Sequence, residues 1–257
     1  MKSRLIGHGS GTVVSIAVLF RTLSAPVQQA FAASSGVLWL GNDDAGSVFK
    51  TDTAGARLQE LMDTPTTGIA WDGAALFFSD AEGTITERTP DGTVIDTFAI
   101  TPNIGTEDLA WDSTRRRLWR TVHLGPTLQR IDAGTHALEA SFPLDANDPV
   151  IGPVGAMGIA YDAGRDLLYV SFCNAGCNDF SQGVVKSFNP DTGAEVAVLF
   201  RTTGFATAGL GYDSVTDTLW VGDVAAVRNM TLAGAVLSSF TGPIPGRFID
   251  GLEFIRR

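Results

Sequence analysis

Six carboxylates stand where one alternating apolar run of the sequence ends or another begins: Glu107, Asp108, Asp250, Asp80, Asp223 and Asp43. The first three precede such a run, and the other three follow one. Oxygen donors without sulfur are the ligands that Ca²⁺ and Mg²⁺ prefer. The residue types therefore predict a calcium or magnesium site formed by Glu107, Asp108 and Asp250, with Asp80 and Asp223 as weaker contributors. Asp also hydrogen-bonds locally at strand ends, so the alternative is that Asp80 and Asp223 close turns and the others are solvated.

The runs that flank these acids belong to a repeat. Leu109-Ala-Trp111-Asp112 is followed by a polar link and then by Leu118-Trp119, which predicts two strands of a hairpin. The same pattern recurs three more times, with its aspartates at Asp72, Asp162 and Asp213. The four aspartates are separated by 40, 50 and 51 residues. Periods of this size indicate a unit that stacks on copies of itself, and the four aspartates are expected in its turns.

Two partial copies of the repeat lie at the ends of the domain. Leu252-Glu-Phe254 supplies a first strand near the C-terminus, and Val37-Leu-Trp-Leu40 supplies a second strand near the N-terminus. Together they make one complete unit, so the repeat number is five. The sequence predicts a ring that is closed by pairing the C-terminal strand with the N-terminal unit.

Aromatic residues support this alignment. The ten aligned positions of the first and second strands contain all five Trp and all three Tyr of the chain. Aromatic side chains at these positions are expected to pack between neighbouring sheets. They are therefore not available as a sugar-binding platform, and Phe172 and Phe180 are among the few aromatic residues left to line a binding face.

Two further short strands follow each aromatic pair, with turns such as Pro90-Asp-Gly92 between them. Four antiparallel strands per unit, repeated radially, predict an all-β fold, a five-bladed β-propeller. At this level the chain resembles bacterial exported propellers of the NHL, YVTN and SMP-30-like kind, whose blades carry similar aliphatic-x-aromatic-Asp signatures. The resemblance covers residues 36 to 257. It implies the fold, whereas the superfamily hosts unrelated activities.

Antiparallel strand order predicts which loops share a face. The connections that enter first strands and those that leave second strands should lie together on one rim. The six carboxylates named above fall on that side, which we call the acidic rim. The other predicted members of the binding face are Asn42, His123, Phe172 and Phe180.

The first 33 residues differ from the rest. They contain Lys2 and Arg4, an apolar run over residues 12–20 and the small-residue segment Ala30-Phe-Ala32. These features predict a signal peptide, and thus one mature domain over residues 34–257 that is secreted or periplasmic; the alternative is a short anchor that is not cleaved. No later run is apolar enough to insert into a membrane. In an exported protein, Cys173 and Cys177 are expected to form a disulfide.

The net charge of −10 becomes more negative once the basic residues of the signal peptide are removed. Such a domain repels nucleic acid and anionic lipid. We expect a monomer that binds a protein, a glycan or a small molecule on its acidic rim without catalysis. The alternative is a metal-dependent lactonase or esterase, because Thr106-Glu107-Asp108-Leu109 resembles the segment that carries a metal ligand in SMP-30-like enzymes.

Overall fold

A computed structural model describes residues 35–42, 46–102, 105–122, 125–174, 179–224, 226–243 and 246–256. The chain divides between Phe31 and Ala32, and every described residue belongs to the second part. The predicted signal peptide lies outside the described residues, as do Asp43, His123 and Cys177. Within these ranges, no helix has the length and apolar character that crossing a membrane requires.

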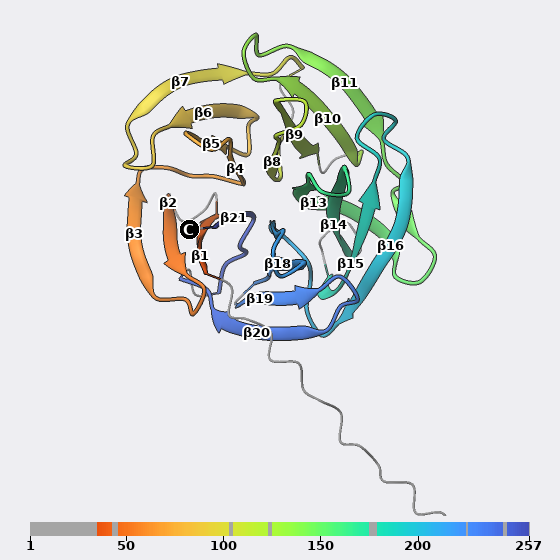
Figure 1. Cartoon of the computed structure of the whole chain (residues 1–257). Helices are drawn as coiled ribbons and strands as arrows, with labels where there is room; N and C mark the ends of the chain where they lie inside the picture. Colours follow the sequence, from red (N-terminus) through yellow and green to blue (C-terminus); the bar gives the residue numbers. More distant parts are fainter. Residues whose placement is uncertain are drawn as a thin grey trace, which may run out of the picture. The chain divides into compact units, whose positions relative to one another are not determined.

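The described residues form five antiparallel sheets arranged as a β-propeller of five blades (Figure 1). Blade 1 consists of β21 (Gly251–Arg256), β1 (Gly36–Asn42), β2 (Ser47–Asp52) and β3 (Arg57–Met62). Blade 2 consists of β4 (Gly68–Trp71), β5 (Leu76–Ser79), β6 (Thr84–Arg88) and β7 (Val94–Ala99). Blade 3 consists of β8 (Leu109–Asp112), β9 (Arg117–Val122), β10 (Thr127–Asp132) and β11 (Leu138–Pro143).

Blade 4 has a fifth strand, because the chain adds a short hairpin before it. It consists of β12 (Asn147–Asp148), β13 (Gly152–Asp162), β14 (Leu167–Asn174), β15 (Asp179–Phe188) and β16 (Glu195–Thr203). Blade 5 consists of β17 (Leu210–Asp213), β18 (Thr218–Gly222), β19 (Ala226–Thr231) and β20 (Val236–Thr241). The fold class predicted from the repeat is thus confirmed.

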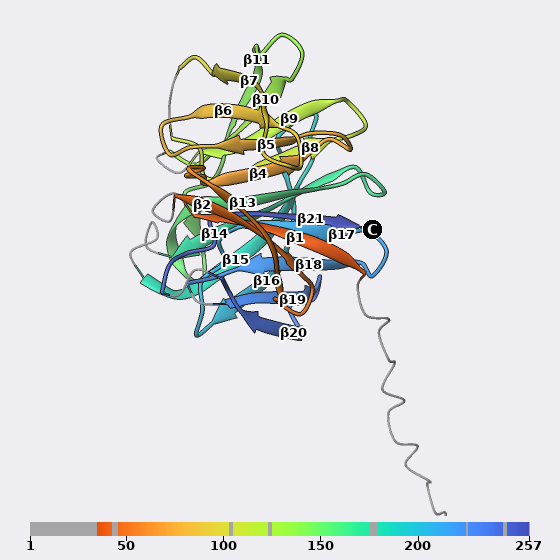
Figure 2. The same cartoon turned by 90° about the vertical axis from the view of Figure 1, so that its left-hand side faces the viewer.

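The ring is closed as the partial repeats predict. Strand β21 pairs with β1 in antiparallel register, from Gly36 opposite Arg256 to Gly41 opposite Gly251. Figure 2, which views the blades from the side, shows β21 and β1 next to each other. The last strand of the chain is therefore the innermost strand of the first blade, and it removes a sheet edge that β1 would otherwise expose.

Packing between neighbouring blades explains why the aromatic residues recur at the same position of each repeat. The second-strand ring of one blade contacts the first-strand ring of the next, as in the Phe77–Trp111 stack at 6.1 Å and the Trp220–Phe254 stack at 6.1 Å. Tyr169 meets Tyr212 edge-on at 5.4 Å. These contacts fill the wedge between neighbouring sheets, as expected from the sequence.

The repeated aspartates close the turn between the first two strands. In each case Oδ1 accepts backbone N–H groups from the turn, for example from Ala74 and Ala75 at Asp72. Arginines in two of these turns reach the next blade. Arg115 forms a bidentate pair with Asp166 at 2.7 and 2.8 Å, and Arg165 pairs with Asp217 at 2.7 Å through both terminal nitrogens. The repeated aspartates are therefore structural residues, as predicted.

Candidate functional site

A pocket of about 340 Å³ opens where the rim loops of all five blades meet. It is lined by Asn42, Thr67, Ala81, Thr106, Glu107, Phe180, Val224, Gly246, Arg247, Phe248 and Asp250. We call it the rim pocket. Its walls come from loops that enter first strands, from the ends of second strands and the loops that leave them, and from the start of β15, which carries Phe180. Strand order thus correctly predicts that these loops share a face.

Four residues of the predicted site line this pocket: Glu107, Asp250, Asn42 and Phe180. Asp250 is 9% exposed, and its Oδ2 accepts a hydrogen bond of 2.8 Å from Asn42 Nδ2. Asn42 is 3% exposed, and its Oδ1 has no hydrogen-bond partner. A buried acceptor without a donor costs about 1–3 kcal/mol. The pocket therefore contains two acids and an amide oxygen that still lacks a donor.

The apolar wall of the rim pocket is an aromatic pair. The ring of Phe180 meets that of Phe248 edge-on at 4.3 Å between centroids. Phe180 is 43% exposed, and among the described residues it is the one aromatic ring in the group of exposed large apolar side chains. Arg247, also exposed, is the single basic residue among the described residues that line the pocket. Two acids against one base leave the pocket with a net negative charge, so it favours a cationic ligand.

Asp108 lies deeper, on the axis of the ring, and is fully buried. Its Oδ1 accepts the backbone N–H groups of Leu109 at 2.9 Å and Ile69 at 3.2 Å. Its Oδ2 accepts those of Ile159 and Leu210, both at 3.2 Å. One carboxylate thus joins the innermost strands β4, β8, β13 and β17, which belong to four different blades.

This arrangement revises the interpretation of Asp108. Four converging N–H groups solvate an anion and repel a cation, so the carboxylate is placed to hold the blades together and not to bind a metal. Burial raises the pKa of Asp108 well above its usual range, whereas the four N–H donors lower it, and because they use both oxygens as acceptors the geometry favours the ionised form. Within the described part of the chain, no three carboxylate, histidine or cysteine side chains form a group that could hold a metal ion.

The signal for this axial carboxylate in the sequence lies in the repeat and not in a motif. In the repeat alignment, the other four blades have glycine where blade 3 has Asp108: Gly68, Gly158, Gly209 and Gly251. A Cβ atom on Gly68 would lie 2.7 Å from Asp108 Cα, and one on Gly158 would lie 2.2 Å from the Ala208 carbonyl oxygen. The axis therefore has room for one side chain at this level, and Asp108 supplies it.

The two weaker candidates of the cation site do not line the rim pocket. Asp80 Oδ1 accepts the backbone N–H groups of Glu82 and Thr84, at 3.0 and 2.8 Å, and so closes the turn between β5 and β6. Asp223 accepts from the backbone of Val224 and from the guanidinium of Arg228. Asp80 thus has the turn-closing role that the sequence left open as the alternative, and Asp223 is engaged by Arg228 of its own blade.

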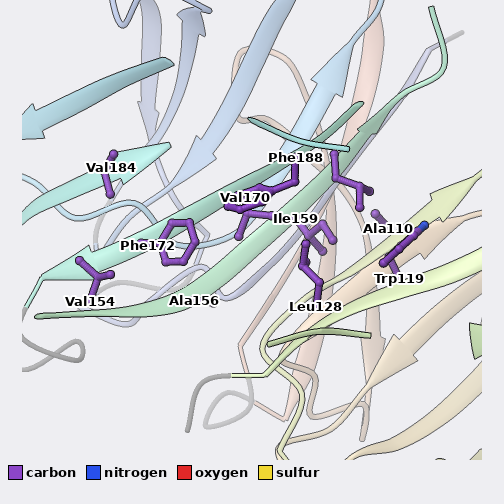
Figure 3. Close-up of a cluster of buried hydrophobic side chains, with 11 residues drawn as sticks. Ala110, Trp119, Leu128, Val154, Ala156, Ile159, Val170, Phe172, Val184 and Phe188 are labelled. Carbon is purple, nitrogen blue, oxygen red and sulfur yellow. The ribbon is translucent and has the colours of Figure 1, made fainter. Parts of the chain in front are cut away.

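The prediction that Phe172 lines the binding face is wrong. Phe172 is 1% exposed and packs in the core of blade 4 with Val154, Val184 and Phe188 (Figure 3). The reason is that β14 does not end at the expected loop but continues to Asn174. There it pairs with an extended β13, so that Phe172 lies opposite Ala156. The extra length of this blade is strand, and its side chains are buried.

A second acid, Glu253 on the innermost strand β21, was not predicted as a functional residue. In the repeat it replaces a small residue, since the other blades have Ala70, Ala110, Ala160 and Gly211 at this position. Glu253 is half-buried, and desolvation raises the pKa of its carboxyl group well above its usual range. The protonated form is therefore favoured in the folded protein relative to the unfolded chain.

Glu253 should make stability depend on pH in a defined direction. An acid whose pKa is raised by folding stabilises the protein below its unfolded pKa of about 4.3, and this contribution is lost as the pH rises through the folded pKa. Glu253→Gln should therefore raise the melting temperature at pH 7.5 and change it little at pH 4. Each 1 kcal/mol corresponds to about 2–4 °C for a domain of this size. The control is the exposed Glu82→Gln, which should change the melting temperature little at either pH. Equal effects of Glu253→Gln at both pH values, or no effect at pH 7.5, would contradict this role.

Comparisons with solved structures agree with the fold. A chain in a crystal structure of a nidogen/laminin complex is 14% identical, with a TM-score of 0.55 over 86% of this chain and 98% of that one. A protein of unknown function from Bacteroides caccae is 11% identical, with a TM-score of 0.56 over 87% of this chain and all of the other. Hydrazine synthase from Kuenenia stuttgartiensis is 13% identical, with a TM-score of 0.50 over 76% and 61% of the two chains.

At these identities the likeness shows a β-propeller and nothing finer. No protein-family model matches the sequence, and the search of curated proteins finds no match.

Proposed function

We propose that this protein is an exported, non-catalytic β-propeller that binds a ligand in the rim pocket of its acidic face. The observation that carries the proposal is the convergence of residues from all five blades on one pocket, with an exposed aromatic ring and an acceptor without a donor. Binding sites combine an apolar wall with a few convergent polar groups, and this pocket has both. Its volume suits a small molecule or one side chain of a larger partner.

Export and kinship with the NHL, YVTN and SMP-30-like propellers are part of the same proposal. They rest on the N-terminal segment and on the blade signatures of the sequence. A calcium or magnesium ion in the channel mouth, and the lactonase or esterase activity that it would support, receive less support. The reason is that Asp108 hydrogen-bonds to four N–H groups, which leaves Glu107 and Asp250 as the acids of the pocket.

The test is a binding screen by ligand-observed NMR with small neutral, anionic and cationic aromatic fragments. Wild-type protein should bind members of at least one class with dissociation constants in the millimolar range or below. Ala81→Trp, which fills the pocket, should weaken this binding at least tenfold, whereas Ala54→Trp, on an exposed turn outside the pocket, should not.

If no class binds, or if both tryptophan variants bind like the wild type, the rim pocket is not the binding site. Hydrolysis of an ester or lactone that depends on added calcium and is lost in Glu107→Gln would show that the protein is an enzyme. That result would replace the proposal of a non-catalytic binder.

A further inference from the structure

The rim pocket also indicates which chemical class of ligand it takes. We propose that it binds a small organic cation with a protonated primary amine and an apolar body; this inference rests on the proposed function of the pocket. The amine would lie at Asp250 and Glu107, and the apolar body would lie against the exposed ring of Phe180.

The polar half of the pocket matches an ammonium group in charge and in hydrogen bonding. Two carboxylates and one guanidinium leave a net negative charge, which one monocation neutralises. Asn42 Nδ2 already donates to Asp250, while Asn42 Oδ1 has no donor. A primary ammonium group carries three N–H donors and no acceptor, so it can serve several acceptors at once.

The two hydroxyl groups of the lining, those of Thr106 and Thr67, already have hydrogen-bond partners within the protein. Thr106 Oγ1 accepts a hydrogen bond of 3.1 Å from the buried Arg120, and Thr67 Oγ1 lies 3.4 Å from both the carbonyl oxygen and the hydroxyl of Ser79. Both hydroxyl groups are therefore engaged within the protein.

The aromatic half favours an organic cation over a metal ion. Calcium takes six to eight oxygen ligands and magnesium six in a regular octahedron. Two carboxylates beside a phenylalanine pair are a poor set for either ion. A cation near the face of an aromatic ring gains about 0.5–1 kcal/mol at an exposed site, and an apolar body gains from covering Phe180. Phe180 and Phe248, at 4.3 Å, already form a wall that such a body can contact.

The inference is tested by calorimetric titration with four probes at pH 7 and low salt. Benzylamine, with its protonated amine, should bind at least about tenfold more tightly than benzyl alcohol, and benzoate should bind more weakly than both. Benzyltrimethylammonium has the same charge without N–H donors, so it should bind several-fold more weakly than benzylamine. Added salt should reduce the preference for the cation.

Charge variants of the lining make the test specific. Glu107→Gln and Asp250→Asn should each weaken benzylamine binding about tenfold or more, since each removes a charged hydrogen-bond acceptor. Arg247→Gln should strengthen it several-fold, because the pocket then holds two acids and no base. Loss of folding cannot imitate a gain in affinity, so this variant keeps the test decisive even if Asp250→Asn is unstable. Glu82→Gln, an exposed rim acid that does not line the pocket, is the matched control and should bind like the wild type.

The possible results distinguish an error in the assigned ligand class from an error in the rim pocket as the binding site. If benzyl alcohol or benzoate binds as tightly as benzylamine, and Ala81→Trp abolishes that binding, the rim pocket is a binding site but the amine assignment is wrong. If calcium displaces benzylamine and itself raises the melting temperature in a way that Glu107→Gln removes, the site is a metal site. If none of the probes binds, both the amine assignment and the proposed function fail.

Discussion

Deletion of residues 248–257 should give an aggregated or protease-sensitive protein with no cooperative melting transition. The deletion removes β21 and with it the whole register of pairs between β21 and β1. It also uncovers the cluster in which Leu252 and Phe254 pack against Leu38, Leu40 and Trp220. The deletion also removes Ile249 of the same cluster. Burial of one large apolar side chain contributes about 1.5–3 kcal/mol, so the loss of these three residues and of the strand pairing approaches the whole stability of a domain.

The measurement is circular dichroism with thermal melting, together with limited proteolysis. A synthetic peptide of residues 246–257, added to the truncated chain, should restore a cooperative transition, and a scrambled peptide of the same composition should not. A truncated protein that stays soluble and melts cooperatively without the peptide would show that closure of blade 1 is not required for folding.

Much of the fold could be predicted because each repeat can be recognised from residues that lie close together in the sequence. The alternation around Trp111 and Leu118, and the turn at Asp112, are short-range features that each strand pair carries by itself. Closure follows from the two partial copies at the ends of the domain. The positions of the Trp and Tyr residues identify the surfaces between blades, because packing between sheets imposes the same requirement at every blade.

The axial carboxylate was harder to predict because its partners come from four separate repeats. Asp108 accepts from Ile69, Ile159 and Leu210, which lie 39 to 102 residues away. The donors are backbone N–H groups, which every residue except proline has, so the types of the partner residues do not reveal these hydrogen bonds. The useful signal is the contrast with the glycines in the other four repeats, which shows how little room the axis offers.

The burial of Phe172 depends on strand length, which local patterns define poorly. The pair Cys173 and Cys177 suggests a loop tip, yet β14 runs to Asn174 and pairs on both sides. A loop boundary placed two residues too early moves a side chain from the core to the surface. Phe180 lies at the start of β15 and not in the expected loop, yet it still lines the rim pocket. Asn42, Glu107 and Asp250 line it as well, because strand order brings the ends of their strands together whatever the length of each loop.

Replacement of the axial Asp108 by Asn should be among the most destabilising single substitutions in this protein. The amide has nearly the shape of the carboxylate, but one of its two acceptor oxygens becomes an NH₂ donor that faces backbone N–H groups. Two of the four N–H groups then lose their acceptor. An unsatisfied buried donor costs about 1–3 kcal/mol, so the expected loss is about 2–6 kcal/mol, a large part of the stability of a typical domain.

The matched control is Asp145→Asn. Asp145 is exposed, and its Oδ1 accepts a local hydrogen bond of 2.9 Å from the backbone of Asn147. This variant should change the free energy of unfolding by about 0.5 kcal/mol or less. Urea denaturation at pH 7, followed by tryptophan fluorescence, gives both values on the same scale.

Asp108→Gly distinguishes an anion site from a mere space-filling role. It makes the axis of blade 3 like that of the other blades and leaves four N–H groups pointing at an unfilled position, because no protein acceptor replaces the carboxylate. Formate, a small free carboxylate, should bind there and raise the melting temperature of Asp108→Gly in a concentration-dependent way, by linkage to the folded state. The wild type and Asp108→Asn should show no such rise, since the position is occupied in both. If formate has the same effect on all three proteins, or if Asp108→Asn is as stable as the wild type, the carboxylate does not hold the blades together through these hydrogen bonds.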